Sequence, residues 1–387
     1  LIRTMGQKGF WDFEERQQEL LNKNKTLKYL NDIIPWELFR DELESLHKKD
    51  RKSNAGRKPI DVILMFKLLI LQQLYNISDE ALEYQVKDRL SFMEFLNLGI
   101  EDPVPDATTV WLFRQRLKDH DKIEALFEQF SDYLNQQGYQ AQGGQIMDAT
   151  LIPVPKQKMT KQEKEDLKQG QIPEEWQNDP HKMAQKDIDA KWTKKNNQSY
   201  FGYKNHINID VDYGFIRQYI ITDASVHDSQ ALTRLLDDLN AGKGVWADSA
   251  YRSAGIEWLL SFLNWTSHIH ERPYRNRPLS EEQKEKNTER SKTRSHVEHV
   301  FGAWVMQLGG KALRSIGLGR AEVNLGLKNL TYNFRAPRKI QILLRMGTRL
   351  QWFQALQIRN KAINRGALYA FHLLGNTKIC PELKSSK

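Results

Sequence analysis

The chain has 387 residues, with 58 Lys and Arg against 49 Asp and Glu, and a net charge of +9 at pH 7. Hydrophobic residues make up 40% and charged residues 28%, values that exclude a disordered chain and a bundle embedded in a membrane. The single cysteine, Cys380, excludes an intrachain disulfide and a cysteine-rich zinc site.

The positive charge is concentrated towards the carboxyl end. Residues 311–387 hold 15 Lys and Arg against 2 acidic residues, whereas residues 1–310 hold 43 against 47. Because neutralised phosphates supply most non-specific affinity for nucleic acid, this distribution favours a polyanionic partner, with a solvated basic tail as the alternative. The longest apolar run, residues 62–74, contains Lys67 and is too short to span a bilayer. No export signal is recognisable, so we expect a cytoplasmic protein without a membrane partner.

The first 140 residues carry helical signals. Ile63, Phe66 and Leu69 recur at three-residue spacing, and Ser78 and Asp106 stand where helix N-caps are expected. These patterns predict an all-helical domain over residues 1–140.

From residue 143 the pattern changes to short β-rich runs. The turn signal Asp212-Tyr213-Gly214 separates two of them and predicts an antiparallel hairpin, and a helix is expected over residues 229–239. The polar segment 156–199 has few candidates for a core, so we interpret it as a surface insertion. A mixed α/β sheet follows, with strands expected over residues 145–154, 206–211, 215–222 and 245–248.

Two aspartates occupy unusual places on these strands. Asp148 shares one strand face with Ile146, Thr150 and Ile152, where a carboxylate is costly unless it is paired or binds a cation. Asp248 is expected to close the fourth strand, at the end where α/β sheets build their sites.

A glutamate on a later helix completes the candidate site. Glu298 lies on the flank of a helical stripe of apolar residues, so we expect it to lean over the sheet edge and not towards water, with Arg294 on the same flank. Two aspartates and a glutamate provide the oxygen ligands that Mg²⁺ prefers. The stripe consists of Val297, Val300, Phe301, Trp304 and Leu308.

Other interpretations stay open at this point. The trio can be a salt-bridged structural cluster, and four further aspartates, Asp210, Asp212, Asp223 and Asp228, compete with it. A transition-metal site is a weaker alternative, because the histidines match no known zinc spacing. They are His206, His227, His268, His270, His296 and His299.

Eight ordered blocks extend this pattern over residues 9–335. They are residues 9–12 (GFWD), 56–61 (GRKPID), 90–93 (LSFM), 104–109 (VPDATT), 143–150 (GGQIMDAT), 201–206 (FGYKNH), 245–253 (VWADSAYRS) and 297–301 (VEHVF). With these blocks the chain resembles the DDE transposases of bacterial insertion sequences, specifically the insertion-sequence-five group.

The resemblance implies a ribonuclease H-like mixed-sheet catalytic domain over residues 141–335, followed by a basic tail, 336–387. It implies that Asp148, Asp248 and Glu298 bind two Mg²⁺ ions, with Mn²⁺ as a substitute, and that Arg294 belongs to the catalytic motif. Asp148 would bridge both ions, and the same site would cleave element ends and then transfer them to target DNA. A homodimer on double-stranded DNA is expected.

The resemblance also has departures. Val305 stands where relatives often have Lys, and Ser291 where some have Tyr, which weakens the expected phosphate contacts. A catalytically silent DNA-binding relative is therefore one alternative, and a metal-dependent nuclease unconnected to transposition is another. The candidate DNA contacts are Arg57, Lys58, Arg114, Lys118 and Arg252.

Overall fold

The computed structural model describes residues 12–23, 25–47, 59–195, 197–274 and 277–336 of the chain. The part up to Ala336 forms one compact unit. The candidate DNA contacts Arg57 and Lys58 and the predicted basic tail beyond Ala336 lie outside the described residues.

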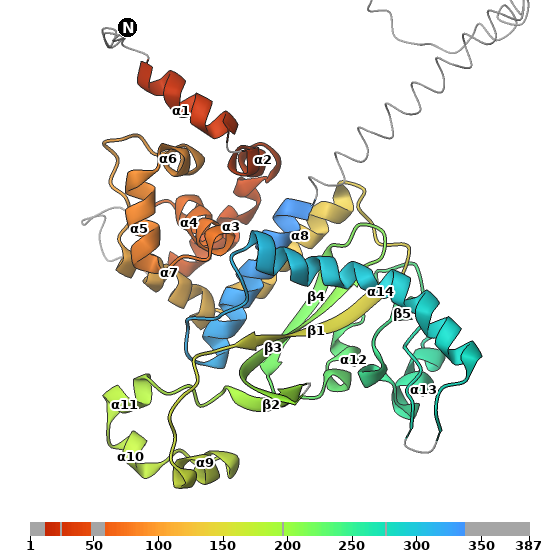
Figure 1. Cartoon of the computed structure of the whole chain (residues 1–387). Coiled ribbons are helices and arrows are strands. Elements are labelled where there is room, and N and C mark those ends of the chain that lie inside the picture. Colours follow the sequence, from red (N-terminus) through yellow and green to blue (C-terminus); the bar gives the residue numbers. More distant parts are fainter. Residues whose placement is uncertain (1–11, 24, 48–58, 196, 275–276, 337–387) are drawn as a thin grey trace, which may run out of the picture. The chain divides into compact units, whose positions relative to one another are not determined.

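The amino-terminal region is helical throughout its described part, as its periodicity predicts (Figure 1). Ser78 and Asp106 are N-caps, because their side chains accept hydrogen bonds from the amides of Ala81 and Thr109. The helices are α1 (Asp12–Lys23), α2 (Lys25–Ile33), η1 (Trp36–Phe39), α3 (Arg40–Glu44), η2 (Ser45–His47), α4 (Val62–Tyr75), α5 (Asp79–Asp88), α6 (Leu90–Leu96), α7 (Ala107–Asp119) and α8 (Lys122–Gln136).

An aromatic cluster forms the core of this helical region. Trp36, Phe39, Phe66 and Phe130 pack around Phe334, with ring centroids 4.7–6.4 Å from the Phe334 ring. Phe334 belongs to a helix over residues 318–336, at the far end of the described chain. The core of the amino-terminal helices is therefore closed by a helix that follows the sheet in sequence.

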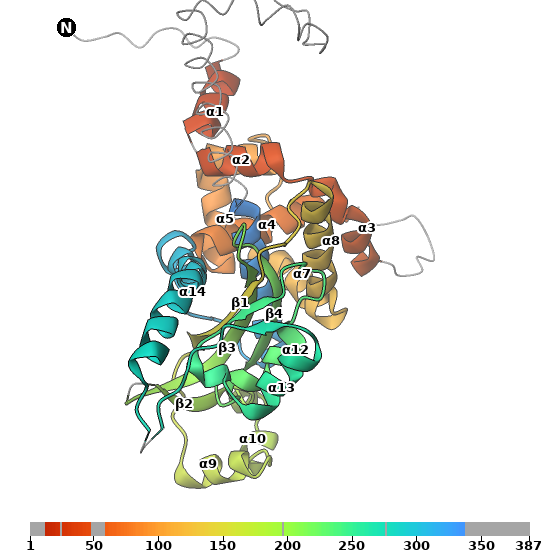
Figure 2. The ribbon, with the colours of Figure 1, turned by 90° about the vertical axis from the view of Figure 1, so that its right-hand side faces the viewer.

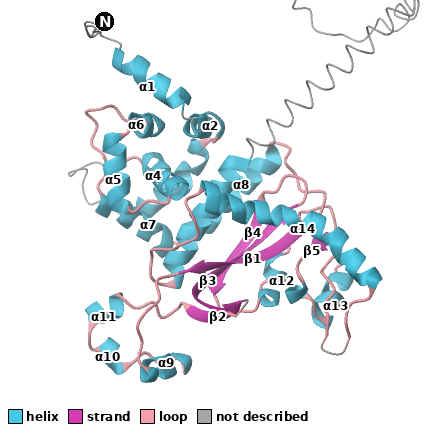
Figure 3. Ribbon diagram, viewed as in Figure 1, coloured by secondary structure: helices cyan, strands magenta, loops and turns pink. Residues whose placement is uncertain are grey.

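A six-stranded mixed sheet follows the helices (Figure 3). β3 pairs antiparallel with β1, β2 and β4, whereas β5 is parallel to β1 and β6. β3 and β4 form the hairpin predicted around Asp212-Tyr213-Gly214. The strands are β1 (Gln145–Pro153), β2 (Lys191–Lys195), β3 (Gln198–Asp210), β4 (Ile216–Asp223), β5 (Gly244–Trp246) and β6 (Thr266–Ser267).

Helices cover both faces of the sheet (Figure 2). α12 (Leu232–Leu235) and α13 (Ala254–Phe262) pack on one face, where Leu232, Leu235 and Leu260 are fully buried with Met147 of β1. α14 (Glu281–Gln307) lies against the opposite face of β1. Its buried residues include Val297, Val300 and Trp304, so the predicted apolar stripe is the packed side of this helix.

Several predicted elements differ from the structure. The strand predicted over 206–211 is the end of the longer β3, which begins at Gln198. The helix expected over 229–239 is reduced to η3 (Asp228–Gln230) and α12, because the backbone turns extended at Leu236 and the amide of Asp237 bonds Gln145 Oε1. The predicted insertion 156–199 is partly built into the fold: it buries Trp176 completely and contributes β2. It also contains α9 (Lys161–Lys168), α10 (Glu174–Gln177) and α11 (Pro180–Ala184).

No helix among the described residues is both long enough and apolar enough to cross a membrane. The longest of the named helices, α14, has 27 residues and carries charged side chains along its first four turns.

Candidate active site

A cavity of about 550 Å³ opens where α14 crosses β1. Its walls come from widely separated parts of the chain, so only the tertiary fold brings them together. The polar and charged residues lining it are Asp148 and Thr150 of β1, Lys195 of β2, Tyr200 of β3, Asp248 after β5, Arg294 and Glu298 of α14, and Lys311.

Two hydrogen-bond donors hold the Asp148 carboxylate in the wall of this cavity. The amide of Ala149 donates to Oδ1 at 2.7 Å, and Arg294 Nη1 donates to Oδ2 at 2.8 Å. Burial raises the pKa of Asp148 to about 6, and the nearby Asp248 adds to the rise, while Arg294 opposes it. The predicted strand face is observed, since Ile146, Thr150 and Ile152 are buried on the same side.

Asp248 follows β5 instead of closing it, because the strand ends at Trp246. Its Oδ1 accepts from the amide of Ala250 at 2.8 Å and so caps η4 (Ser249–Tyr251). This Asx-type cap holds the carboxylate at the sheet edge, from which it lines the same cavity as Asp148.

Glu298 reaches the cavity from α14, but its side chain is 67% exposed. The expectation that it points away from water is therefore wrong, because the flank of the apolar stripe faces an open cavity. Its nearest cation is Arg294, with Nη2 3.7 Å from Glu298 Oε1.

The Arg294 guanidinium lies between the carboxylates of Asp148 and Glu298, where a metal cation would be expected. In the described part of the chain, no three acidic, histidine or cysteine side chains converge closely enough to hold one ion as they stand. The donor chemistry nevertheless suits a hard divalent cation, because three carboxylates line one cavity and a guanidinium already occupies the bridging position between Asp148 and Glu298. Arg294 Nε is itself buried without a hydrogen-bond partner.

Two lysines in this cavity were missed by the sequence interpretation. Lys311 Nζ donates to Thr150 Oγ1 at 2.7 Å, and Lys195 lies at the end of β2. Burial lowers the pKa of Lys311, and the neighbouring Lys195 contributes. Val305, the position where relatives often have Lys, is half exposed on α14 and does not line the cavity.

Lys311 is placed by a loop over residues 309–317, which we call the 309–317 loop. Asn76 Nδ2 donates to the carbonyl of Gly309 at 2.6 Å, Lys328 Nζ donates to that of Gly310, and the amide of Leu313 bonds the carbonyl of Pro153. The signal in the sequence was Gly309-Gly310 directly after a helix, since both residues have positive φ and turn the chain back towards β1.

The competing aspartates form ion pairs and hydrogen bonds that stabilise the fold. Asp210 is fully buried against Arg217, at 2.9 Å, and Asp212 accepts from the amides of Gln142 and Gly143. Asp228 pairs with Lys204 at 2.8 Å.

Asp223 accepts from Ser225. The histidines form no metal cluster among the described residues. His206 is fully buried beside Thr222, and His268 stacks on Trp246 at 4.4 Å.

The candidate DNA contacts are engaged within the chain to different degrees. Arg114 pairs with Asp79 at 2.6 Å and donates to Gln72, and Arg252 contacts Glu271 at 3.0 Å and the carbonyl of Ile269. Lys118 lies 3.1 Å from the exposed Asp119.

The sheet, with its preceding helices and α14 across β1, has the ribonuclease H-like fold of DDE transposases. The family described as "Transposase DDE domain" matches residues 139–334, about half of the chain, and "Transposase domain (DUF772)" matches residues 15–116. The chain thus belongs to the transposases with a DDE domain.

Among solved structures, the chain is similar to that described as "Cryo-EM structure of piggyBac transposase synaptic complex with hairpin DNA". The TM-score is 0.38 and the sequence identity 12%, over 77% of this chain and 73% of that one.

Proposed function

We propose that this protein is the transposase of a bacterial insertion sequence of the insertion-sequence-five group, which binds the element ends, cleaves them and joins them to target DNA. The observation that carries the proposal is the presence of Asp148, Asp248 and Glu298 in one cavity, each delivered by a different element. The family match over residues 139–334 supports the same conclusion.

In this proposal Asp148, Asp248 and Glu298 hold divalent cations, Mg²⁺ with Mn²⁺ as substitute. When bound, such ions activate water and neutralise charge on the phosphate that is cleaved. The chain contributes fixed carboxylates, because backbone amides orient Asp148 and Asp248 before any ion arrives.

The cations of the cavity would act on the DNA itself. Arg294, Lys195 and Lys311 surround the carboxylates and can neutralise phosphate oxygens that enter the cavity. Lys311, in the 309–317 loop, supplies the cavity with a positive charge that the apolar Val305 cannot supply. The departure at Val305 therefore leaves the cavity with its cations and argues against a catalytically silent relative.

We further propose that residues 1–140 and 141–335 serve as end-binding and catalytic domains, and that two copies synapse two ends. In this proposal Lys118 contacts DNA. Arg114 and Arg252 would instead position their acidic partners, Asp79 and Glu271.

The test is cation-dependent cleavage of labelled duplexes that carry the element's own ends. Asp148→Asn and Glu298→Gln should abolish cleavage at the end junction while end binding persists, because carboxylates are lost and cations are kept. Glu285→Gln, on an exposed turn of the same helix α14, is the matched control and should cleave normally. Cleavage that survives in Asp148→Asn would falsify the assignment, and binding without cleavage by every protein would indicate a silent relative.

A further inference from the structure

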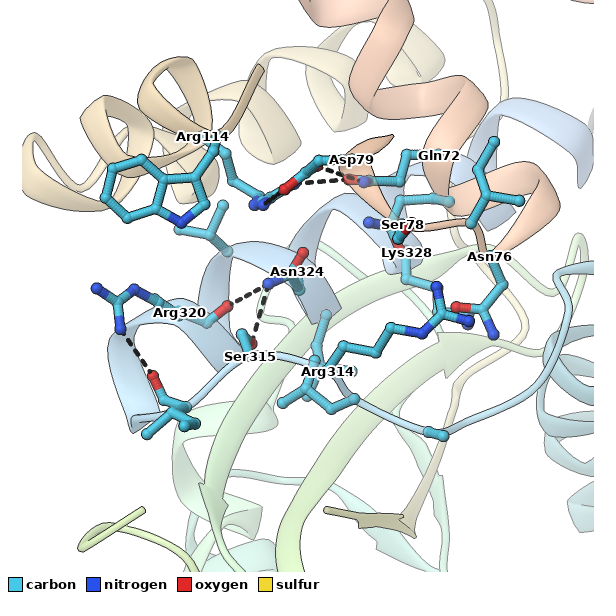
Figure 4. A pocket seen from close by; sticks show the side chains of 18 of the residues that line it. Gln72, Asn76, Ser78, Asp79, Arg114, Arg314, Ser315, Arg320, Asn324 and Lys328 are labelled. Carbon is cyan, nitrogen blue, oxygen red and sulfur yellow. Dashed lines mark hydrogen bonds and ion pairs between the residues drawn. The ribbon is translucent and has the colours of Figure 1, made fainter. Parts of the chain in front are cut away.

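A second cavity, of about 450 Å³, lies between helices α4, α5 and α7 on one side and the chain from Lys311 to Lys328 on the other (Figure 4). Its walls are strongly basic. Six of its lining residues are Lys or Arg and two are acidic, Asp79 and Glu80. The basic ones are Arg114, Lys118, Lys311, Arg314, Arg320 and Lys328.

The acidic residues of this cavity do not neutralise all of its positive charge. The half-buried pair of Arg114 with Asp79 removes one charge of each sign. Arg314 is exposed, and the described residues offer its side chain neither a hydrogen bond nor an ion pair. Among the described residues Arg320 donates to two neutral oxygens, Gln115 Oε1 at 3.0 Å and the carbonyl of Ile316. Two guanidinium groups therefore keep their full charge at the cavity wall.

The side chains around the cavity also suit a nucleic acid. Figure 4 shows Arg314 extending along the lower wall towards Asn76 and Lys328, and Arg320 on the same side of the cavity. Trp111 is 40% exposed in the wall, with the Arg320 guanidinium 5.9 Å from its ring. Arginine binds phosphate with two parallel donors, and an exposed tryptophan can pack on a sugar or base.

This basic cavity adjoins the carboxylate cavity. Lys311 lines both. Arg314 also lines a third cavity, of about 340 Å³, with Lys156, Lys158 and Lys186 in its walls. Residues of the 309–317 loop thus line all three cavities, and each cavity has lysine or arginine in its walls.

We propose that Arg314 and Arg320, with Lys118 and Trp111, bind the phosphate backbone of the element-end DNA and lead one strand past Lys311 to the carboxylates. We call these residues the phosphate track. The inference rests on the proposed function, and it places DNA recognition on the segment after α14 as well as on the amino-terminal helices.

The track is tested by the salt dependence of DNA binding. The probe is a fluorescein-labelled duplex of the terminal repeat, bound by the full chain in EDTA so that no cleavage occurs and read by anisotropy. Each lost phosphate contact should reduce the slope of log K against log salt by about 0.9. Arg314→Gln should therefore weaken binding several-fold and lower the slope by about 1, and the double variant with Arg320→Gln by about 2.

Two controls separate charge from folding. Arg234→Gln removes an exposed arginine of α12, which packs on the other face of the sheet, and should leave affinity and slope unchanged. Arg314→Lys keeps the charge and should retain the wild-type slope. Because Arg314 is exposed and its side chain makes no hydrogen bond or ion pair within the described residues, its substitution should leave Tm nearly unchanged.

The outcomes distinguish this inference from the function on which it rests. If the wild type cleaves element ends but Arg314→Gln and the double variant bind with the wild-type slope, the phosphate track is overturned and the transposase proposal stands. If the wild type neither binds nor cleaves those ends, both proposals fail. A reduced slope in both variants, with Arg234→Gln unchanged, supports the track.

Discussion

Asp148 is a largely buried carboxylate whose charge is balanced by one residue. Arg294 Nη1 lies 2.8 Å from it, and the same guanidinium lies 3.7 Å from Glu298. Removal from water makes the ionised form of Asp148 costly, and the nearby Asp248 adds to this cost. The pKa of Asp148 is therefore raised to about 6, although Arg294 opposes the rise. In the metal-free fold the arginine supplies the charge that a divalent ion would supply in the loaded protein.

This balance predicts a stability response to metal. Mn²⁺ or Mg²⁺ at about a hundred times its Kd should stabilise the wild type by about 2.7 kcal/mol, because only the folded chain assembles the carboxylates. Thermal unfolding at pH 7.5, with and without the ion, measures this effect. Asp148→Asn should lose the response, while Asp238→Asn, on an exposed turn, should keep it. An equal rise in Tm for Asp148→Asn would contradict Asp148 as a ligand.

A second residue-scale prediction concerns His206. Its side chain is fully buried, with Nε2 2.9 Å from Thr222 Oγ1, and burial lowers its pKa; Asp228 opposes the shift and Lys204 adds to it. The folded state therefore binds fewer protons than the unfolded state below the ordinary histidine pKa of about 6.5. Its stabilising effect is complete above that pH and is lost as the pH falls through the lowered folded pKa.

Urea unfolding at two pH values checks this sign. Between pH 7.5 and 5.5 the wild type should lose about 1.4 kcal/mol more than His206→Gln. His181→Gln, an exposed histidine of α11, is the control and should follow the wild type. Identical pH dependence in the wild type and His206→Gln would refute the buried neutral histidine.

At the scale of elements, the 309–317 loop decides what the candidate site contains. It begins at Gly309, whose φ is +67°, and a Cβ there would lie 2.4 Å from Cβ of Asn76. The close approach lets Asn76 bond the Gly309 carbonyl and directs Lys311 to Thr150. A side chain at Gly309 would push the loop away from both partners.

Two glycine substitutions seven positions apart test this loop. Gly309→Ala should destabilise the fold by about 1–2 kcal/mol and slow cleavage, because the left-handed backbone and the contact with Asn76 both oppose a side chain. Gly302→Ala, inside α14 with open space around its Cα, should instead stabilise by about 0.5–1 kcal/mol. Chemical denaturation and end cleavage measure both variants, and a neutral Gly309→Ala would show that the loop tolerates displacement.

At the scale of the whole described unit, the two ends of the sequence share one core. Phe334 is fully buried among Trp36, Phe39, Phe66 and Phe130, although more than 200 residues of sheet and helices separate it from Phe130. The catalytic sheet is therefore tied to the helices that precede it by packing as well as by chain connectivity. A fragment ending near residue 140 would expose this aromatic cluster.

Truncating Phe334 measures that coupling. Phe334→Ala should destabilise the protein by about 3–5 kcal/mol, because it leaves a cavity in a packed aromatic core. Unfolding followed by far-ultraviolet circular dichroism should show the loss in the whole unit. Tyr274→Ala, an exposed aromatic, is the control and should cost little. Separate transitions with unchanged sheet stability would mean that the helices and the sheet do not share a core.

Local patterns determined much of this protein from sequence alone. The caps at Ser78 and Asp106, the β3–β4 hairpin and the stripe of α14 depend on residues a few positions apart, so periodicity and turn chemistry predict them. Asp148 could also be singled out from the sequence as a candidate, because a carboxylate within an apolar strand signals a partner.

The tertiary structure decided which side chains meet. Nothing local in the sequence connects Lys311 with Thr150, Arg294 with Asp148, or Phe334 with Trp36, since each pair is joined only by long-range chain geometry. The short helix after β4 and the exposure of Glu298 have the same origin. A hydrogen bond to the distant Gln145 helps to end the predicted helix at Leu236. An open cavity beside α14 leaves Glu298 exposed.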